Sequence, residues 1–154
     1  MGEIPVNTEI LFHPIGIIRT PFTEREGTPI QASLSETRGS VDIFPEFEQG
    51  LQDLEGFSHI FLLYAFHESS GFSLLVKPFL DDQLHGLFAT RHPNRPNPLG
   101  LSVVRLLGRE GNTLEIDGVD MLDGTLLLDI KPYLPEFDVR TGTRNGWYET
   151  RKRA

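Results

Sequence analysis

Short apolar runs separated by turn residues make up most of the hydrophobic pattern of this chain. The most apolar run, residues 57–66, predicts a buried strand. Further strands are predicted at residues 9–19 (interrupted at Pro14), 40–44, 84–89, 99–107, 112–119 and 126–130. Six or seven short strands with turns at regular spacing predict an all-β barrel, with an open sandwich as the alternative.

One short helix is expected within this strand pattern. Residues 45–55 carry apolar side chains at helical spacing, with Pro45 at the first helical position and Gly56 able to end the helix. Residues 23–37 predict an irregular surface loop, and residues 68–82 are expected to be rich in loops. Strands do not alternate with helices and no glycine-rich phosphate-binding motif occurs, so a Rossmann fold is not expected.

The composition is that of one soluble globular domain. Its 154 residues suffice for a real core, and 38% of them are hydrophobic. No apolar run reaches membrane-spanning length and no signal peptide is recognisable, so we expect a cytoplasmic protein without a membrane segment. The chain has no cysteine, and its five histidines lack metal-ligand spacing, so disulfides and a metal site are not expected.

The charge is strongly acidic except near the end of the sequence. A formal net charge of -8 argues against a surface covered by nucleic-acid-binding residues. A local basic region is nevertheless formed by Arg140, Arg144, Arg151, Lys152 and Arg153. We therefore divide the chain into a domain of residues 1–138 and a basic C-terminal tail of residues 139–154.

The strongest functional signal is the arginine–proline segment, residues 88–102, with the sequence FATRHPNRPNPLGLS. Its three prolines exclude a helix and a central strand and favour a stiff, extended loop. A stiff loop has little entropy to lose on binding, so it presents its polar side chains almost preformed: Arg91, Asn94, Arg95 and Asn97. A rigid connector is the alternative, but two arginines and two asparagines without an acidic residue favour a binding site.

A cluster of carboxylates follows in an apolar setting. Asp120, Asp123 and Asp129 stand among Val, Met and Leu residues, and Asp123-Gly124 is typical of a turn. Because buried carboxylates need partners, we expect them to be complemented by the arginines of the arginine–proline segment or, alternatively, by a cationic or hydroxyl-rich ligand. Among the histidines, His67 at the end of the apolar strand is the one we expect in a ligand pocket.

Four segments together resemble the TsaA-like, or TrmO, family in order and spacing: residues 16–22, 56–67, 88–102 and 119–138. The resemblance spans residues 11–138. It implies a single-sheeted β-barrel of about six or seven short strands with one or two short helices, which forms a homodimer and binds S-adenosyl-L-methionine. The implied activity is N6-methylation of threonylcarbamoyladenosine (t6A) at position 37 in the tRNA anticodon loop.

The resemblance also implies site residues. The cofactor is expected to contact Pro29, Ile30, Gln31, His67, Glu68, Arg91, Leu101, Leu122, Asp123, Gly124 and Thr125. Arg95 and Asn97 are expected to contact the substrate. A carboxylate is expected to accept the departing proton or to orient the acceptor N–H, with Asp120 and Asp129 as candidates and a scaffold ion pair as the alternative for Asp129.

Two other functions remain open. tRNA-modifying bacterial relatives carry an additional C-terminal domain, whereas this sequence ends at Ala154. An S-adenosylmethionine-binding enzyme that acts on a small molecule is therefore an alternative, as is a non-catalytic cofactor-binding module.

Overall fold

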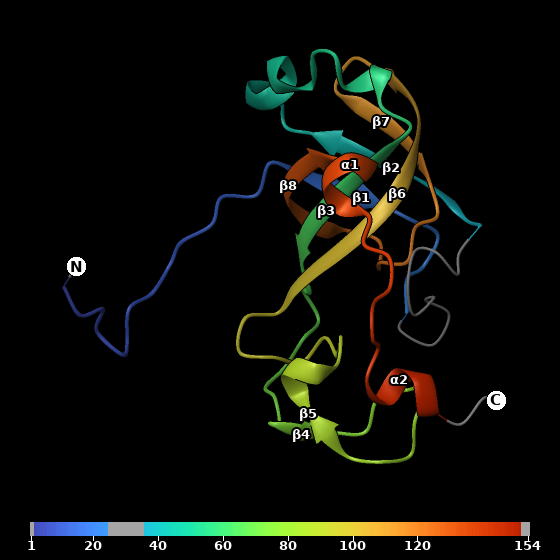
Figure 1. Ribbon diagram of the computed structural model, residues 1–154. Coiled ribbons are helices and arrows are strands. Elements are labelled where there is room, and N and C mark those ends of the chain that lie inside the picture. Colours follow the sequence, from blue (N-terminus) through green and yellow to red (C-terminus); the bar gives the residue numbers. More distant parts are fainter. Residues whose placement is uncertain (1, 25–35, 152–154) are drawn as a thin grey trace.

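Six antiparallel strands form a closed barrel in the computed structural model, which describes residues 2–24 and 36–151 (Figure 1). Around the barrel the strands follow the order β1-β2-β7-β6-β3-β8. Their bounds are β1 Gly16–Arg19, β2 Arg38–Ile43, β3 His59–Ala65, β6 Leu99–Glu110, β7 Thr113–Asp117 and β8 Thr125–Pro132. The closed ladder confirms the predicted all-β barrel and leaves none of these strands with an unpaired edge.

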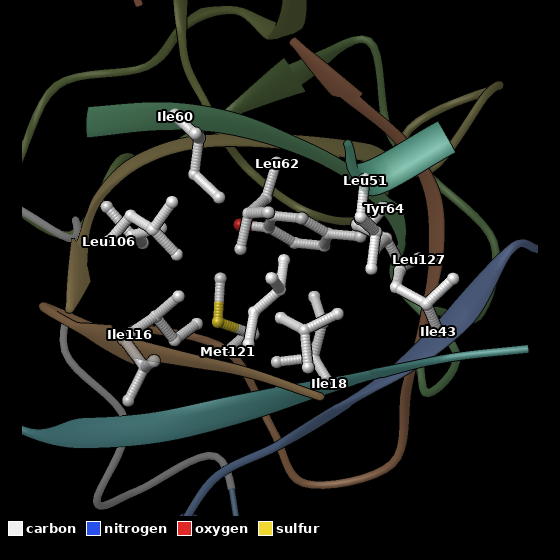
Figure 2. Packing of buried hydrophobic residues seen from close by; sticks show 14 residues of the cluster. Ile18, Ile43, Leu51, Ile60, Leu62, Tyr64, Leu106, Ile116, Met121 and Leu127 are labelled. Atoms are coloured by element: carbon white, nitrogen blue, oxygen red, sulfur yellow. The ribbon is translucent and has the colours of Figure 1, made fainter. Parts of the chain in front are cut away.

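The barrel interior is filled by every second residue of each strand. In β3, Ile60, Leu62 and Tyr64 are buried while their neighbours are partly exposed. This alternation follows from the two-residue period of a strand, which sends successive side chains to opposite faces. Figure 2 shows the Tyr64 ring reaching across an interior that is otherwise aliphatic. Burial of each Leu or Ile side chain stabilises the fold by about 1.5–3 kcal/mol.

The region predicted as one helix consists of two 3₁₀ helices instead, η3 (Pro45–Leu51) and η4 (Leu54–Gly56). Between them Asp53 adopts a left-handed backbone conformation with φ of 71°, which breaks the helical path. Pro45 does stand at the start of η3, as predicted, and Leu51 is buried against the core. Helical spacing of apolar residues thus located the element but not its type.

Two other predicted strands are shorter than expected. The first begins only at Gly16, beyond Pro14, and residues 9–13 are exposed. Residues 84–89 contain the two-residue strand β5 (His85–Gly86) and a 3₁₀ turn, η5 (Leu87–Ala89). β5 pairs with β4 (Leu75–Val76) in a separate two-stranded sheet, so this region does not belong to the barrel.

A small lobe lies beside the barrel. We define it as residues 68–98, which contain β4, β5, η5 and most of the arginine–proline segment. Two short helices follow β8: α1 (Pro135–Asp138) lies near the barrel, and α2 (Trp147–Thr150) lies against the small lobe (Figure 1). None of the helices in residues 2–24 and 36–151 has the length and apolar character needed to cross a membrane.

Candidate functional site

Buried polar side chains gather at one end of the barrel, which we call the mouth. The end of β3 lies here beside the starts of β6 and β8, since Ala65 pairs with Leu99 and with Leu126. The end of β1 lies here too, because Ile18 pairs with Thr125 at the start of β8. The residues that follow β7 pass across the same end and include Asp120. Four polar or amphipathic side chains are almost inaccessible there: Tyr64, Ser102, Asp120 and Thr125. Such groups are costly to bury without partners, so their contacts carry information about the site.

Three of these residues form one hydrogen-bonded chain. The Tyr64 hydroxyl lies 2.8 Å from Ser102 Oγ, and Ser102 Oγ donates to Asp120 Oδ1 at 2.9 Å. A serine hydroxyl carries a single hydrogen, so Ser102 accepts from Tyr64 while it donates to Asp120. The chain therefore runs in one direction, from the phenol through the hydroxyl to the carboxylate.

The electrostatic surroundings keep Tyr64 protonated. Burial raises the pKa of its hydroxyl above the usual value, and the negative charge of Asp120 raises it further. The hydrogen bond with Ser102 and the positive charge of Arg91 act in the opposite direction but are smaller. Tyr64 can thus remain a donor at physiological pH, and Arg91 is close enough to the mouth to influence its charges.

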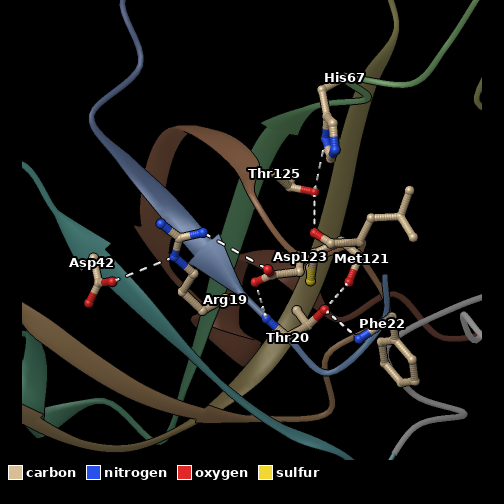
Figure 3. A network of polar contacts seen from close by, with 9 residues as sticks. Arg19, Thr20, Phe22, Asp42, His67, Met121, Asp123 and Thr125 are labelled. Atoms are coloured by element: carbon tan, nitrogen blue, oxygen red, sulfur yellow. Dashed lines mark hydrogen bonds and ion pairs between the residues drawn. The ribbon is translucent and has the colours of Figure 1, made fainter. Parts of the chain in front are cut away.

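The residues between β7 and β8 are tied to the end of β1 (Figure 3). Thr20 donates its amide N–H to Asp123 Oδ1 at 3.1 Å and its hydroxyl to the Met121 carbonyl at 2.8 Å. In return, Asp123 N donates to the Phe22 carbonyl at 2.7 Å. Gly124 then turns the chain with φ of 82°, a conformation that glycine adopts readily. The predicted Asp123-Gly124 turn is therefore present and anchored on both sides.

A single arginine links this turn to the neighbouring strand. Arg19 lies 3.9 Å from a carboxylate oxygen of Asp42 and 3.9 Å from one of Asp123, and all three side chains are partly exposed (Figure 3). Exposed ion pairs of this kind contribute about 0–1 kcal/mol each. A cavity of about 270 Å³ adjoins them between Thr20 and Arg38. Another, of about 240 Å³, lies at the opposite end of the barrel beside η3 and η4.

Thr125 connects the turn to the end of β3. Its hydroxyl donates to the Leu122 carbonyl at 2.6 Å and lies 3.4 Å from His67 Nδ1 (Figure 3). Since the hydroxyl hydrogen is used by Leu122, the contact with His67 requires the histidine to donate. The fold thus brings His67 to the 122–125 turn across 58 residues of sequence.

The arginine–proline segment has neither helix nor strand between Arg91 and Pro98, as its prolines predicted. Arg95 turns back into the loop, with Nη1 donating to the carbonyls of Thr90 at 2.9 Å and His92 at 3.0 Å. Ser69 Oγ lies 3.2 Å from the Pro93 carbonyl oxygen and 3.1 Å from Asn94 Oδ1, so its single hydrogen can be donated to either of them. Arg91 and Asn97 are exposed. The loop is therefore fixed by its own contacts while parts of it face outward.

Several of the predicted site residues lie around the mouth. Contacts join His67 to the 122–125 turn, and Asp120 is part of the buried hydrogen-bonded chain. Leu101 lies on β6 with 55% of its surface exposed. Pro29, Ile30 and Gln31 lie outside the described residues. Asp129 is separated from this group: its half-exposed carboxylate lies 3.4 Å from Lys131 Nζ.

Two residues of the mouth were not among the predicted site residues. Ser102 and Tyr64 each occupy an inward position of a strand, at 3% and 4% exposure. A signal was present for Ser102, since the other buried positions of its strand are glycine or apolar residues. Their pairing across β3 and β6 could not be predicted, because it depends on the register of two strands 38 residues apart.

The fold and the mouth define a class of protein: a single-sheet β-barrel domain with a cluster of buried polar groups at one end. The chain belongs to the TrmO family, since its residues 17–139 match the tRNA-methyltransferase O N-terminal domain. Within these residues lie Tyr64, Ser102, Asp120 and the 122–125 turn. The resemblance inferred from the sequence is thereby confirmed.

Known relatives differ in length and in name. A probable S-adenosyl-L-methionine-binding protein of Pyrococcus abyssi is 57% identical over 91% of this chain and 77% of its own length. A tRNA (adenine(37)-N6)-methyltransferase of Mus musculus is 39% identical over 84% of this chain but only 32% of its own. The crystal structure of TrmO from Pseudomonas aeruginosa has a TM-score of 0.76 and 41% identity, and covers 90% of this chain and 62% of its own.

Proposed function

We propose that this protein is an S-adenosyl-L-methionine-dependent methyltransferase that methylates N6 of t6A at position 37 of tRNA. The observation that carries the proposal is the buried chain of Tyr64, Ser102 and Asp120 at the mouth of a TrmO-family barrel. It places an oriented carboxylate next to the 122–125 turn. The name of the mouse relative supports the reaction, and that of the Pyrococcus abyssi relative supports the cofactor.

The residues at the mouth fit the chemistry of this cofactor. S-adenosyl-L-methionine would supply an electrophilic methyl group, together with a carboxylate and an adenine that need recognition. Arg91 is an exposed residue, and a guanidinium can hold a carboxylate or stack on a planar ring. Backbone groups of residues 122–125 can read an adenine edge, and Leu101 and Leu122 offer apolar surface to its faces. Glu68 and His67 complete the proposed cofactor contacts, together with residues 29–31.

The rigidity of the mouth suits a transfer that depends on alignment. Thr20 and Phe22 hold the 122–125 turn from one side, while His67 contacts it from another. Holding donor and acceptor in register can supply about 7–11 kcal/mol of the barrier in favourable cases. These side chains therefore serve to position groups and exclude water rather than to generate a strong nucleophile.

We assign the proton acceptor to Asp120. Its carboxylate accepts a hydrogen bond from Ser102, so one oxygen is oriented and buried. Asp129, the other candidate, is half exposed and paired with Lys131, as expected of a scaffold ion pair. For the substrate we propose contacts with Asn97, which is exposed, and with Arg95, whose guanidinium also holds its own loop through the Thr90 and His92 carbonyls.

The test is a methyl-transfer assay with labelled S-adenosyl-L-methionine and two pools of tRNA, one carrying t6A and one lacking it. We expect label only in the t6A pool, and mass analysis of digested nucleosides should locate it on N6 of that nucleoside. Cofactor binding without label in either pool would overturn the tRNA assignment.

The acidic charge favours a second candidate, an enzyme with a small-molecule acceptor. A net charge of -8 weakens attraction for a polyanion such as tRNA. The same assay with a cellular extract depleted of RNA distinguishes the two, because only a small-molecule enzyme would transfer label there. Binding without transfer in any fraction would instead indicate a non-catalytic cofactor-binding module.

We also propose that the protein is a homodimer. Large apolar side chains are exposed on the N-terminal segment (Ile4, Val6, Ile10, Leu11 and Phe12) and on the small lobe (Phe72, Leu74, Leu75, Phe79, Leu84 and Phe88). Soluble monomers seldom expose so much apolar surface. Light scattering should give about twice the chain mass of 17.4 kDa, and a monomeric mass would contradict the proposal.

A further inference from the structure

The segment after α1 returns from the barrel to the small lobe, and we call residues 139–151 the strap. Residues 139–146 are exposed and connect α1 to α2 (Figure 1). The family match ends at residue 139, so all of the strap except its first residue lies beyond the matched domain. Its contacts with the small lobe are therefore made by residues that lie almost entirely outside the matched domain.

One side chain of the strap makes the decisive contacts. Trp147 Nε1 donates to the carbonyl of Ala89 at 2.7 Å. The indole stacks on the His85 ring, with 4.7 Å between centroids and 17° between planes. His85 is itself held in place, since its Nε2 lies 2.7 Å from Asp81 Oδ2. The side chains of His85 and Asp81 are both largely buried. The tryptophan is thus held by a hydrogen bond and by a ring that is itself anchored.

Ala89 is the point at which these contacts reach the proposed site. It is the last residue of η5 and stands two positions before Arg91. The next residue, Thr90, donates both its N–H and its hydroxyl to the Leu87 carbonyl, and its own carbonyl accepts from Arg95. A constraint on the Ala89 carbonyl is therefore passed on directly to the backbone that carries Arg91.

We propose that the strap holds the arginine–proline segment in its binding conformation, with Trp147 as a positioning residue. The part of this inference that concerns the cofactor rests on the proposed function, because it assumes that Arg91 contacts S-adenosyl-L-methionine. Undocking of Trp147 lets the loop sample other conformations. The apparent dissociation constant rises in inverse proportion to the fraction of molecules that remain competent.

Hydrogen exchange tests the positioning role without any cofactor. In Trp147→Ala we expect amide exchange of residues 90–97 to be about tenfold faster, while amides of β3 and β6 keep their wild-type rates. The control is Phe137→Ala, which removes an exposed aromatic side chain just before the strap and should leave the loop amides unchanged. Unchanged exchange in residues 90–97 of Trp147→Ala would overturn the proposal.

Calorimetry with S-adenosyl-L-methionine then tests the consequence for binding. We expect an affinity about tenfold weaker in Trp147→Ala, and about threefold weaker in Trp147→Phe, which retains a ring over His85 but loses the bond to Ala89. Wild-type affinity in Trp147→Ala would contradict the proposal that the strap holds the arginine–proline segment in its binding conformation. Failure of the wild-type protein to bind would contradict the proposed function instead, and the exchange data would still decide the role of the strap.

A second variant keeps the test decisive if Trp147→Ala does not fold. His85→Ala removes the stacking partner and leaves the only tryptophan of the chain in place. Iodide should then quench Trp147 fluorescence more strongly than in the wild-type protein, and exchange in residues 90–97 should again be faster. Equal quenching in both proteins, with unchanged exchange, would overturn the proposal.

Discussion

The ring of Tyr64 occupies the space that a side chain at position 100 would need. A Cβ atom built on Gly100 would lie 2.1 Å from Tyr64 Cε2, far closer than any non-bonded contact allows. The two residues pair across β3 and β6, and the missing side chain allows the ring to lie against the β6 backbone. From this position the phenol reaches Ser102, so Gly100 is a structural requirement of the hydrogen-bonded chain at the mouth.

Gly100→Ala should therefore destabilise the protein by about 3 kcal/mol or more, because overpacking of a buried site usually costs 1–3 kcal/mol and here the obstacle is a rigid ring. Gly108→Ala on the same strand is the matched control, since a Cβ atom there would meet nothing within 4 Å. Urea denaturation of both variants measures the difference. Equal stability of the two variants would contradict the described packing.

Tyr64 should make the stability of the protein depend on alkaline pH. In the unfolded chain its hydroxyl ionises near pH 10, whereas burial raises the pKa in the folded state. Above about pH 10 the unfolded state therefore releases a proton that the folded state retains, and the free energy of unfolding falls by up to about 1.4 kcal/mol per pH unit.

Tyr64→Phe should remove this contribution. At pH 8 the variant should be less stable by about 1 kcal/mol, because one buried hydrogen bond is lost. The difference should shrink or reverse between pH 10 and 11. Urea titrations at pH 8, 10 and 11 provide the comparison, and parallel curves for the two proteins would show that burial does not hold the proton on Tyr64.

The anchoring of the 122–125 turn can be separated from the ion pairs around Arg19. Asp123→Ala removes an ion pair to Arg19 and a hydrogen bond from Thr20, whereas Asp42→Ala removes an ion pair to Arg19 and a hydrogen bond from Thr113. We expect about tenfold weaker binding of S-adenosyl-L-methionine only in Asp123→Ala, since only that change frees the turn. Calorimetry gives both affinities, and equal losses would assign the effect to Arg19 instead.

Replacing the two candidate carboxylates should have different effects on activity. Asp120→Asn retains an oxygen to accept from Ser102 but loses the basic carboxylate, so methyl transfer should fall by about 10²–10⁴-fold with little change in cofactor affinity. Asp129→Asn, its control, should stay within about twofold of wild type, because exposed ion pairs contribute little. Single-turnover assays measure the transfer step. Loss of transfer in Asp129→Asn alone would reverse the assignment.

The sequence predicted the barrel well because its signals were local. The apolar runs at β3 and β6, the turn residues between strands and the three prolines of the arginine–proline segment each act within a few residues. The type of helix at residues 45–56 was harder to predict. The division into two 3₁₀ helices depends on the left-handed backbone conformation of Asp53. Within the small lobe the loop-rich character of residues 68–82 was predicted, but its two-stranded sheet was not, because two-residue strands provide almost no periodic pattern.

The site was predictable only in part, for a related reason. The 122–125 turn and His67 were expected together from the family resemblance, and a contact between them is present. Ser102 and Trp147 were missed because their importance arises from partners far away in sequence, Asp120 and Ala89. Such pairs depend on the register of the strands and on where the chain after β8 packs, and no local sequence pattern determines either of these.

The most direct test of the central claim is a crystal structure of the protein grown with S-adenosyl-L-methionine. We expect ligand density at the mouth, between the arginine–proline segment and the 122–125 turn, with a contact to Arg91. Density confined to the opposite end of the barrel, with none beside Arg91, would contradict the proposed site.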